Sequence, residues 1–199
     1  ISNKGAVAGL VIIALLAFVA ILGKWLMPYD PNYSDMTISF QPPGMAHWFG
    51  TDQLGRDIFS RIIDGTRISL TVGISAVAIS LTIGTILGAI AGYRGGKADT
   101  VIMRVMDMML AIPSILLAIA FMAALGKGID KAVIAIGLVS IPEYARIVRG
   151  CILSVKENDY VQAAKVIGNK DVRIVFKHIV PNILSSIVVR ATLGISTAV

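Results

Sequence analysis

The sequence has few of the residues from which soluble domains, disulfides and metal sites are built. Only 15% of its 199 residues are charged, whereas ordinary soluble domains are about a quarter charged. One cysteine, Cys151, excludes a disulfide within the chain and gives no metal cluster. We interpret it as a small packing residue. No phosphate-binding Gly-x-x-x-x-Gly-Lys-Ser/Thr loop occurs, so we do not expect the chain to hydrolyse ATP.

What the sequence has in abundance is long apolar segments. Hydrophobic residues make up 56% of the chain, and three runs contain no charge: Gly5–Gly23, Ile68–Tyr93 and Met108–Gly126. A membrane-spanning helix needs about 20 apolar residues, because the hydrocarbon core is about 30 Å thick. The runs therefore predict an all-α, polytopic membrane helical bundle. Gly5–Gly23 is longer than the apolar core of a signal peptide, so we expect a retained helix.

Two weaker segments complete the predicted membrane part. Ala132–Pro142 reaches membrane length only by running on toward Arg149, and Ile183–Val199 is apolar except for Arg190. With the three clear runs they give five predicted spans. The chain begins at Ile1 rather than Met and ends while still hydrophobic, so we expect a fragment truncated at its C-terminus.

The charges between the runs predict the orientation, because loops rich in Lys and Arg stay in the cytoplasm. Residues 94–104 include three basic residues and one acid, and residues 146–177 include seven basic and three acidic residues. Residues 24–67 include four basic and five acidic residues. We therefore predict a cytoplasmic N-terminus, an external loop over residues 28–67 and a cytoplasmic loop over residues 151–181.

Local signals predict structure within that cytoplasmic loop. Asn158 or Asp159 can cap a short helix, and Gly168 is a natural left-handed stop after it. A second short helix is expected to start at Asn169 and to end before Pro181. The loop should then form a rigid knob of two helices joined at a glycine.

The knob also carries a spaced motif: Gln162-Ala163-Ala164, then Gly168, then His178-Ile179-Val180-Pro181. The two alanines, the glycine and the proline fall at the spacing of the EAA loop of ABC importer permeases, which this segment resembles. Gln162 stands where the family has glutamate, His178 where it has isoleucine and Val180 where it has leucine. These departures leave the spacing of the motif intact.

The external loop supports the same resemblance. It contains Phe49-Gly50-Thr51-Asp52-x-x-Gly55-Arg56-Asp57, which is similar to the outer-loop signature of the oligopeptide, dipeptide and nickel branch. Pro28–Pro31, Tyr93–Gly96 and Ala145–Gly150 also look like this branch. Its members have six helices, so the resemblance implies that the end of the fifth helix and the whole sixth are missing here.

The resemblance implies a function and partners. Residues 1–199 would be the permease domain of an ATP-driven importer of di- or oligopeptides, embedded in the cell membrane and working by alternating access. It would pair with a second, homologous permease, two cytoplasmic ATP-binding subunits and an external substrate-binding protein. ATP and Mg would bind to the ATPase partners, and this chain would bind no cofactor. The residues that dock the ATPase would be Gln162, Ala163, Ala164, Gly168 and Pro181.

Three alternatives remain at this point. A nickel importer of the same branch has little support, because His47 and His178 both lie outside the predicted spans. An ion-driven secondary transporter would need buried acids, and the spans offer only Asp107 and Glu143 near their ends. A membrane enzyme would need a cluster of His, Cys or carboxylate side chains. The net charge of +6 is explained by the cytoplasmic loops, so no nucleic-acid partner is expected.

Two features inside the spans are candidates for packing or function. Gly84, Gly88 and Gly92 form two overlapping GxxxG spacings, which let helices approach closely within the bundle or against the second permease. Arg190 lies about 13 Å along a helix from Pro181 and should face a partner or a cavity. We interpret it as half of a structural ion pair, with the carboxylate of a transported peptide as the other hypothesis.

Further residues precede or occupy the third predicted span. Arg104 and Asp107 lie three apart and are predicted to pair on one helix face. Pro113 should kink the helix or lie at a packed bend. We interpret the methionines as packing residues rather than soft metal ligands; they are Met103, Met106, Met108 and Met109.

Overall fold

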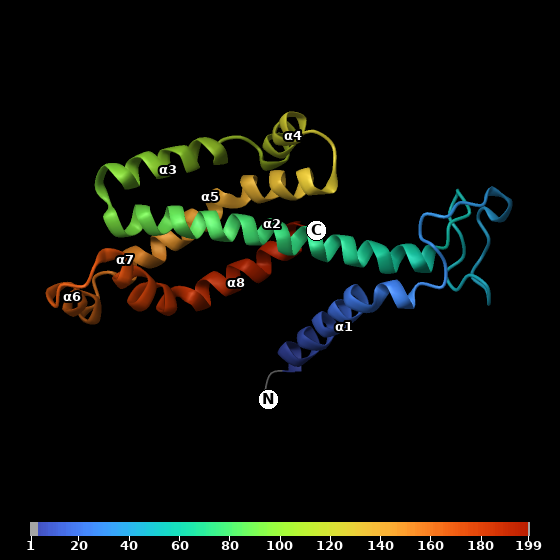
Figure 1. The fold of residues 1–199 in the computed structure, drawn as a ribbon, viewed down its shortest axis with the longest axis horizontal. Coiled ribbons are helices and arrows are strands. Elements are labelled where there is room, and N and C mark those ends of the chain that lie inside the picture. The colour runs from blue at the N-terminus through green and yellow to red at the C-terminus, as the bar shows by residue number, and fades with distance from the viewer. Residues whose placement is uncertain (1–3, 199) are drawn as a thin grey trace. The chain divides into compact units, whose positions relative to one another are not determined.

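The computed structural model describes residues 4–198, and the named elements in that range are all helices (Figure 1). This confirms the predicted all-α class. The chain divides into two compact units, Ile1–Thr71 and Val72–Val199. Ile1 and Val199, the ends of the predicted permease domain, lie outside the described residues.

The first unit begins with α1 (Lys4–Leu26), which contains the first predicted span. Lys24 lies in its last turn, where a cation interacts favourably with the helix dipole. The polar segment that follows contains one short 3₁₀ turn, η1 (Met36–Ile38). The Asp35 side chain caps this turn by accepting a hydrogen bond from the backbone N–H of Thr37 at 3.0 Å.

α2 (Ile58–Arg94) is longer than the second predicted span. Its 37 residues measure about 55 Å at 1.5 Å per residue, which exceeds the hydrocarbon core of about 30 Å. The predicted span is the uncharged part of this helix, because the charges before Ile68 end the apolar run but do not stop the helix. Residues up to Thr71 belong to the first unit and the rest of α2 to the second.

The third predicted span, Met108–Gly126, is wrong as a single helix. The segment is divided between α3 (Gly96–Leu110) and α4 (Ser114–Leu125), whose axes are bent by 96°. Pro113 explains the break, because it lacks an N–H and disfavours the helical conformation in the residue before it. The kink expected at this proline is therefore a sharp corner.

The fourth predicted span lies within one long helix, α5 (Ile129–Val155), which continues through the buried Pro142. Charged residues interrupt its apolar face at intervals. The structure has three helices of sufficient length and apolarity to cross a membrane among residues 4–198, namely α1, α2 and the continuous helix Asp171–Ala198. The bent pair α3–α4 would make a fourth. The total of five spans stays a prediction.

The loop over residues 151–181, predicted to be cytoplasmic, differs from its prediction in its second half. α6 (Asp159–Val166) ends before Gly168 as expected. The next helix does not end before Pro181, because α7 (Asp171–Ile174), a π-helical turn η2 (Val175–Ile179) and α8 (Val180–Ala198) follow without a gap. Pro181, which has no N–H to donate, lies in the first turn of α8, directly after the π turn.

The three glycines of α2 lie directly against α5. A Cβ atom added at Gly84 would lie 2.5 Å from the Cβ of Tyr144, and one at Gly92 would lie 3.0 Å from the carbonyl oxygen of Arg149. One at Gly88 would overlap the carbonyl oxygen of Ala145. Only hydrogen fits at these positions, so the two helix backbones pack directly on each other.

Substitution at this contact should be costly. We expect Gly88→Ala to lower the free energy of unfolding by about 1–3 kcal/mol, because the new methyl group meets rigid backbone. The matched control is Gly150→Ala on α5, where an added Cβ has nothing within 4 Å; it should be neutral or raise stability by up to about 1 kcal/mol. Thermal unfolding of both variants in detergent measures the difference, and equal melting temperatures would contradict the proposed contact.

Candidate functional site

The knob is built around α6, a helix of two turns with two distinct faces. Asn158 is at its N-cap position, with extended backbone angles but no side-chain capping bond. Val161 and Ala164 are buried, and Ala163 is exposed. Residues three apart share a helix face, so α6 packs on the rest of the chain through one side and leaves the other free.

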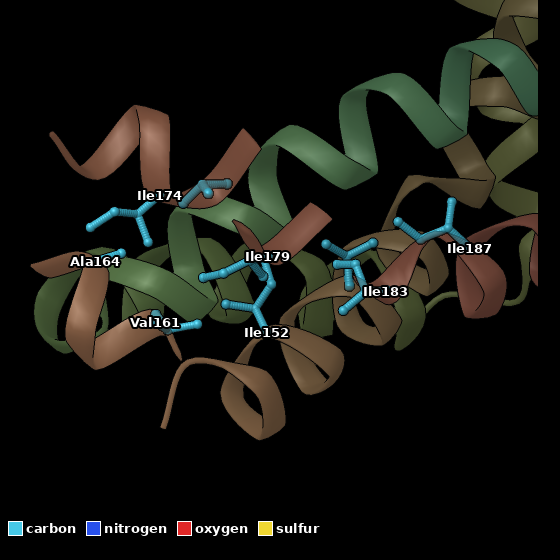
Figure 2. Close-up of a cluster of buried hydrophobic side chains, with 9 residues drawn as sticks. Ile152, Val161, Ala164, Ile174, Ile179, Ile183 and Ile187 are labelled. Carbon is cyan, nitrogen blue, oxygen red and sulfur yellow. The ribbon is translucent and has the colours of Figure 1, made fainter. Parts of the chain in front are cut away.

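The buried side of the knob belongs to one continuous apolar core. Figure 2 shows side chains from α5, α6, α7, η2 and α8 gathered in this core. Its buried members are Val148, Ile152, Val161, Ala164, Ile174, Val175, Ile179, Ile183 and Ile187. Because the same core includes residues of α5 and α8, a displacement of α6 must be passed to those helices. The knob is thus rigidly connected to them.

The motif residues do not all serve one purpose. The resemblance implies that Ala163 and Ala164 both dock the ATPase. Ala164 is only 4% exposed, and its small size lets α6 approach its own core. Gln162 is half-buried, and its Nε2 donates a hydrogen bond of 3.0 Å to the carbonyl oxygen of Lys156. It therefore fastens α6 to the end of α5.

Gly168 makes the turn that ends α6. Its φ of +83° lies in the left-handed region, which L side chains rarely adopt. The backbone N–H and the Nδ2 of Asn169 both donate to the carbonyl oxygen of Ala164, at 3.2 and 3.1 Å. Asn169, expected to start the second helix, thus closes the end of the first. The second begins at Asp171.

The knob exposes four large apolar side chains, which the sequence reasoning missed. Val166 and Ile167 are 88% and 80% exposed, and Val172 and Phe176 are 69% and 66% exposed. The first two occupy the variable positions between the alanines and the glycine of the motif, so no motif could have selected them. Val172 and Phe176 also line a cavity beside α2. Exposed apolar side chains close together in the chain are candidates for a protein-binding surface. We call these four residues the apolar tip.

α2 also reaches the knob. The hydroxyl of Tyr93 donates a hydrogen bond of 2.9 Å to Asp171, and Lys165 lies 5.5 Å from the centre of the Tyr93 ring. A cavity of about 340 Å³ with mainly apolar walls lies beside this contact, between α2 and the helices α7 to α8. Three helices, α2, α5 and α8, therefore converge on the knob. Pro181, the remaining motif residue, is exposed on α8.

Comparison with known proteins decides the family. Residues 84–199 match the model of the binding-protein-dependent transport system inner membrane component. Residues 1–43 match the N-terminal TM domain of oligopeptide transport permease C. The chain belongs to the binding-protein-dependent transport permease family. This agrees with the resemblance of its knob to the EAA loop.

Individual relatives have transport names. The dipeptide transport system permease protein DppC of Alkalihalophilus pseudofirmus is 47% identical over 99% of this chain and 65% of its own length. The oligopeptide transport system permease protein OppC of Bacillus subtilis is 44% identical over 100% of the chain and 65% of its own length. The glutathione transport system permease protein GsiD of Pectobacterium atrosepticum is 47% identical over 96% and 64%. The chain thus spans about 65% of the length of these curated relatives.

The segment predicted to be the outer-loop signature forms a hydrogen-bonded turn within the first unit. The Asp52 carboxylate accepts bonds from the backbone N–H groups of Leu54 and Arg56 and from Nε of Arg56, at 2.8, 3.0 and 2.8 Å. The carboxylate of Asp57 lies 2.9 Å from Nδ1 of His47 and accepts from the N–H of Ser60 at 2.7 Å.

These bonds shift the titration of both carboxylates. Burial by itself would raise the pKa of Asp57, but the donors from Ser60 and His47 outweigh it and hold the pKa below its usual range. The same balance lowers the pKa of Asp52, where the opposing donors come from Arg56 and Leu54. The signature therefore shapes the loop through ionised carboxylates.

Arg190 forms an ion pair with Glu143, so α8 is joined to α5 by opposite charges. Its guanidinium also lies 5.7 Å from the centre of the Tyr144 ring. Within the described part of the chain, Nε of Arg190 is a buried polar atom without a hydrogen-bond partner. The pair is only partly buried, since the side chains of Arg190 and Glu143 are 25% and 49% exposed.

The predicted pair of Arg104 and Asp107 is wrong. Asp107 bonds to Arg146 of α5 at 2.7 Å instead. Spacing along α3 allowed the local pair, but packing against α5 brings a second guanidinium to the same carboxylate.

Met106 is buried against α5, with Met103 and Met109 packed around it, whereas Met108 is exposed. Cys151 packs against the core of the knob.

The two motif alanines should respond differently to enlargement. We expect Ala164→Leu to lower the free energy of unfolding by about 1–3 kcal/mol, because the core beneath α6 has no room for it. Ala163→Leu should change stability by less than about 0.5 kcal/mol, because its side chain faces outward. Thermal unfolding of the two variants gives the comparison. A larger loss for Ala163→Leu would refute the assigned faces of α6.

Proposed function

We propose that this chain is the transmembrane permease subunit of an ATP-driven importer of di- or oligopeptides. The observation that carries the proposal is the knob, whose apolar tip is exposed while its base shares one core with α5 and α8. The family is that of a binding-protein-dependent transport system, which supports an external substrate-binding protein as a partner. The peptide substrates follow the names of the similar dipeptide and oligopeptide permeases.

The proposed arrangement completes the features that the sequence predicts. The knob lies in the cytoplasm with the N-terminus, and residues 28–67 form the external loop. Five spans cross the membrane here, and a second, homologous permease lies beside them. Two ATP-binding subunits hold ATP and Mg and catalyse hydrolysis, while this chain provides no catalytic group. A nickel importer of the same branch is the second candidate.

In the proposed mechanism, the ATPase acts on the knob and the knob acts on the helices. A partner surface covers Ala163 and the apolar tip, which removes their side chains from water. When the ATP-binding subunits close, the knob moves as a unit, because Gln162, Gly168 and the shared core fix its shape. Tyr93, α5 and α8 then carry the displacement into the membrane, and the pathway opens outward.

Charge placed on Ala163 and on the apolar tip should separate the chain from its ATPase. We expect Ala163→Glu combined with Ile167→Glu to reduce co-purification of the ATP-binding subunits at least about tenfold, since interface centres tolerate charge poorly. Both residues are exposed, so the fold should survive. ATP-driven uptake of a labelled dipeptide should fall together with the recovery of the ATP-binding subunits. The matched control is Lys127→Glu at the exposed turn between α4 and α5.

Two results would refute this docking surface. One is normal recovery of the ATP-binding subunits with the double variant. The other is equal loss with Lys127→Glu, since the effect would then be one of general charge. Proton-driven uptake without any ATPase would refute the importer itself and support the secondary transporter.

A charge exchange tests the role of Arg190. We propose that the pair of Arg190 and Glu143 holds α8 against α5. Arg190→Glu alone leaves two like charges in contact and should abolish uptake, whereas Arg190→Glu with Glu143→Arg restores the pair and should recover much of it. If the double variant assembles normally but still fails to transport, then Arg190 binds the carboxylate of the peptide instead. Uptake of a labelled dipeptide and size-exclusion profiles give both readouts.

A further inference from the structure

A charged pocket on the second unit is not used by the proposed docking or transport steps. It lies between α3 and α5 and has a volume of about 430 Å³. Its walls contain three arginines and two aspartates among seven residues; these are Asp99, Thr100, Met103, Arg104, Asp107, Arg146 and Arg149. The pocket therefore has one more cation than it has anions.

Two of the arginines are neutralised by the aspartates. Arg149 binds Asp99 through two parallel bonds of 2.5 and 2.6 Å, and Arg146 binds Asp107 at 2.7 Å. These pairs fasten α3 to α5 and position the walls of the pocket. They also leave Arg104 as the surplus cation.

The Arg104 guanidinium is available to bind an anion. Its side chain is exposed, and no ion pair or hydrogen bond joins it to another side chain within residues 4–198. A guanidinium presents a planar fork of N–H donors that matches two oxygens of a phosphate group. Arg146 and Arg149 lie in the same walls, each paired with an aspartate, so the surplus charge is that of Arg104. A phosphate group thus fits the pocket in charge and in donor geometry.

A second feature of α3 decides which phosphate compound fits. Val101, Val105 and Met108 are 63%, 42% and 56% exposed and follow one another at helical spacing. Each lies one residue after a pocket residue, namely Thr100, Arg104 and Asp107. An exposed apolar stripe therefore runs beside the pocket along the same helix. A lipid can occupy both, with its phosphate in the pocket and its acyl chains on the stripe.

We propose that this pocket binds the phosphate of an anionic phospholipid. Basic pockets between helices at the cytoplasmic side of a membrane are suited to such head groups. The inference rests on the proposed membrane orientation, which places the turn at Gly95 and Gly96 and the adjoining pocket at the cytoplasmic boundary. It does not depend on docking of the ATPase or on the transported substrate.

The test measures retained lipid on the whole permease with its partner subunits. The purified complex is equilibrated with vesicles of phosphatidylcholine and phosphatidylglycerol in equal amounts, extracted and washed. Native mass spectrometry then counts bound phosphatidylglycerol. We expect Arg104→Gln to retain it about fivefold less well than the wild type. Arg104→Lys keeps the charge and should retain more than Arg104→Gln, which guards against a folding defect.

The control is Arg173→Gln, which removes an exposed arginine from the proposed cytoplasmic side outside the pocket. It should retain phosphatidylglycerol like the wild type. Equal retention by Arg104→Gln and the wild type would overturn the proposal, and so would an equal loss with Arg173→Gln. Displacement of the lipid by inorganic phosphate would assign the pocket to free phosphate instead.

The lipid assignment would also be overturned if a segment of a partner subunit covered the pocket in the complete complex. In that case the permease separated from its partner subunits would retain phosphatidylglycerol, whereas the complete complex would not. Failure of the lipid test would leave ATPase co-purification unaffected. The two proposals can therefore fail separately.

Discussion

The close contact between α2 and α5 is the constraint on which the second unit depends. Gly84, Gly88 and Gly92 leave no room for a side chain, so the two backbones are held at a fixed separation. α5 in turn carries the partners of the other helices: Arg146 and Arg149 for α3, Glu143 for α8, and Ile152 for the knob. A helix that is fixed along its length can serve as the common support for the rest.

The knob combines two properties that usually oppose each other. Its apolar tip is exposed, as the proposed docking requires, and its base is buried in a shared core, as the proposed transmission of movement requires. Two turns of helix would not be stable alone in water, because isolated helices of this length are marginal. The shared apolar core supplies the missing stability, and the same contacts connect the knob to α5 and α8. Folding and mechanical connection are therefore provided by one set of side chains.

Three ion pairs connect the helices α3, α5 and α8. Asp99, Asp107 and Glu143 each bind an arginine on a different helix, so each pair joins two helices. In a medium of low dielectric constant an unpaired charge is costly, which makes such pairs specific fasteners. Arg104 forms no such pair within residues 4–198. We therefore propose a ligand for its pocket rather than a structural role.

The sequence by itself determined the helical class, the first two apolar helices, the glycine stop after α6 and the family resemblance. These depend on local properties: uncharged length, backbone freedom and motif spacing. The tertiary structure decided which face each residue presents, which is why it separated Ala163 from Ala164 and revealed the apolar tip. It also replaced the local pair of Arg104 and Asp107 by the pair of Arg146 and Asp107. Such choices depend on side chains far apart in the chain, whose meeting no local pattern encodes.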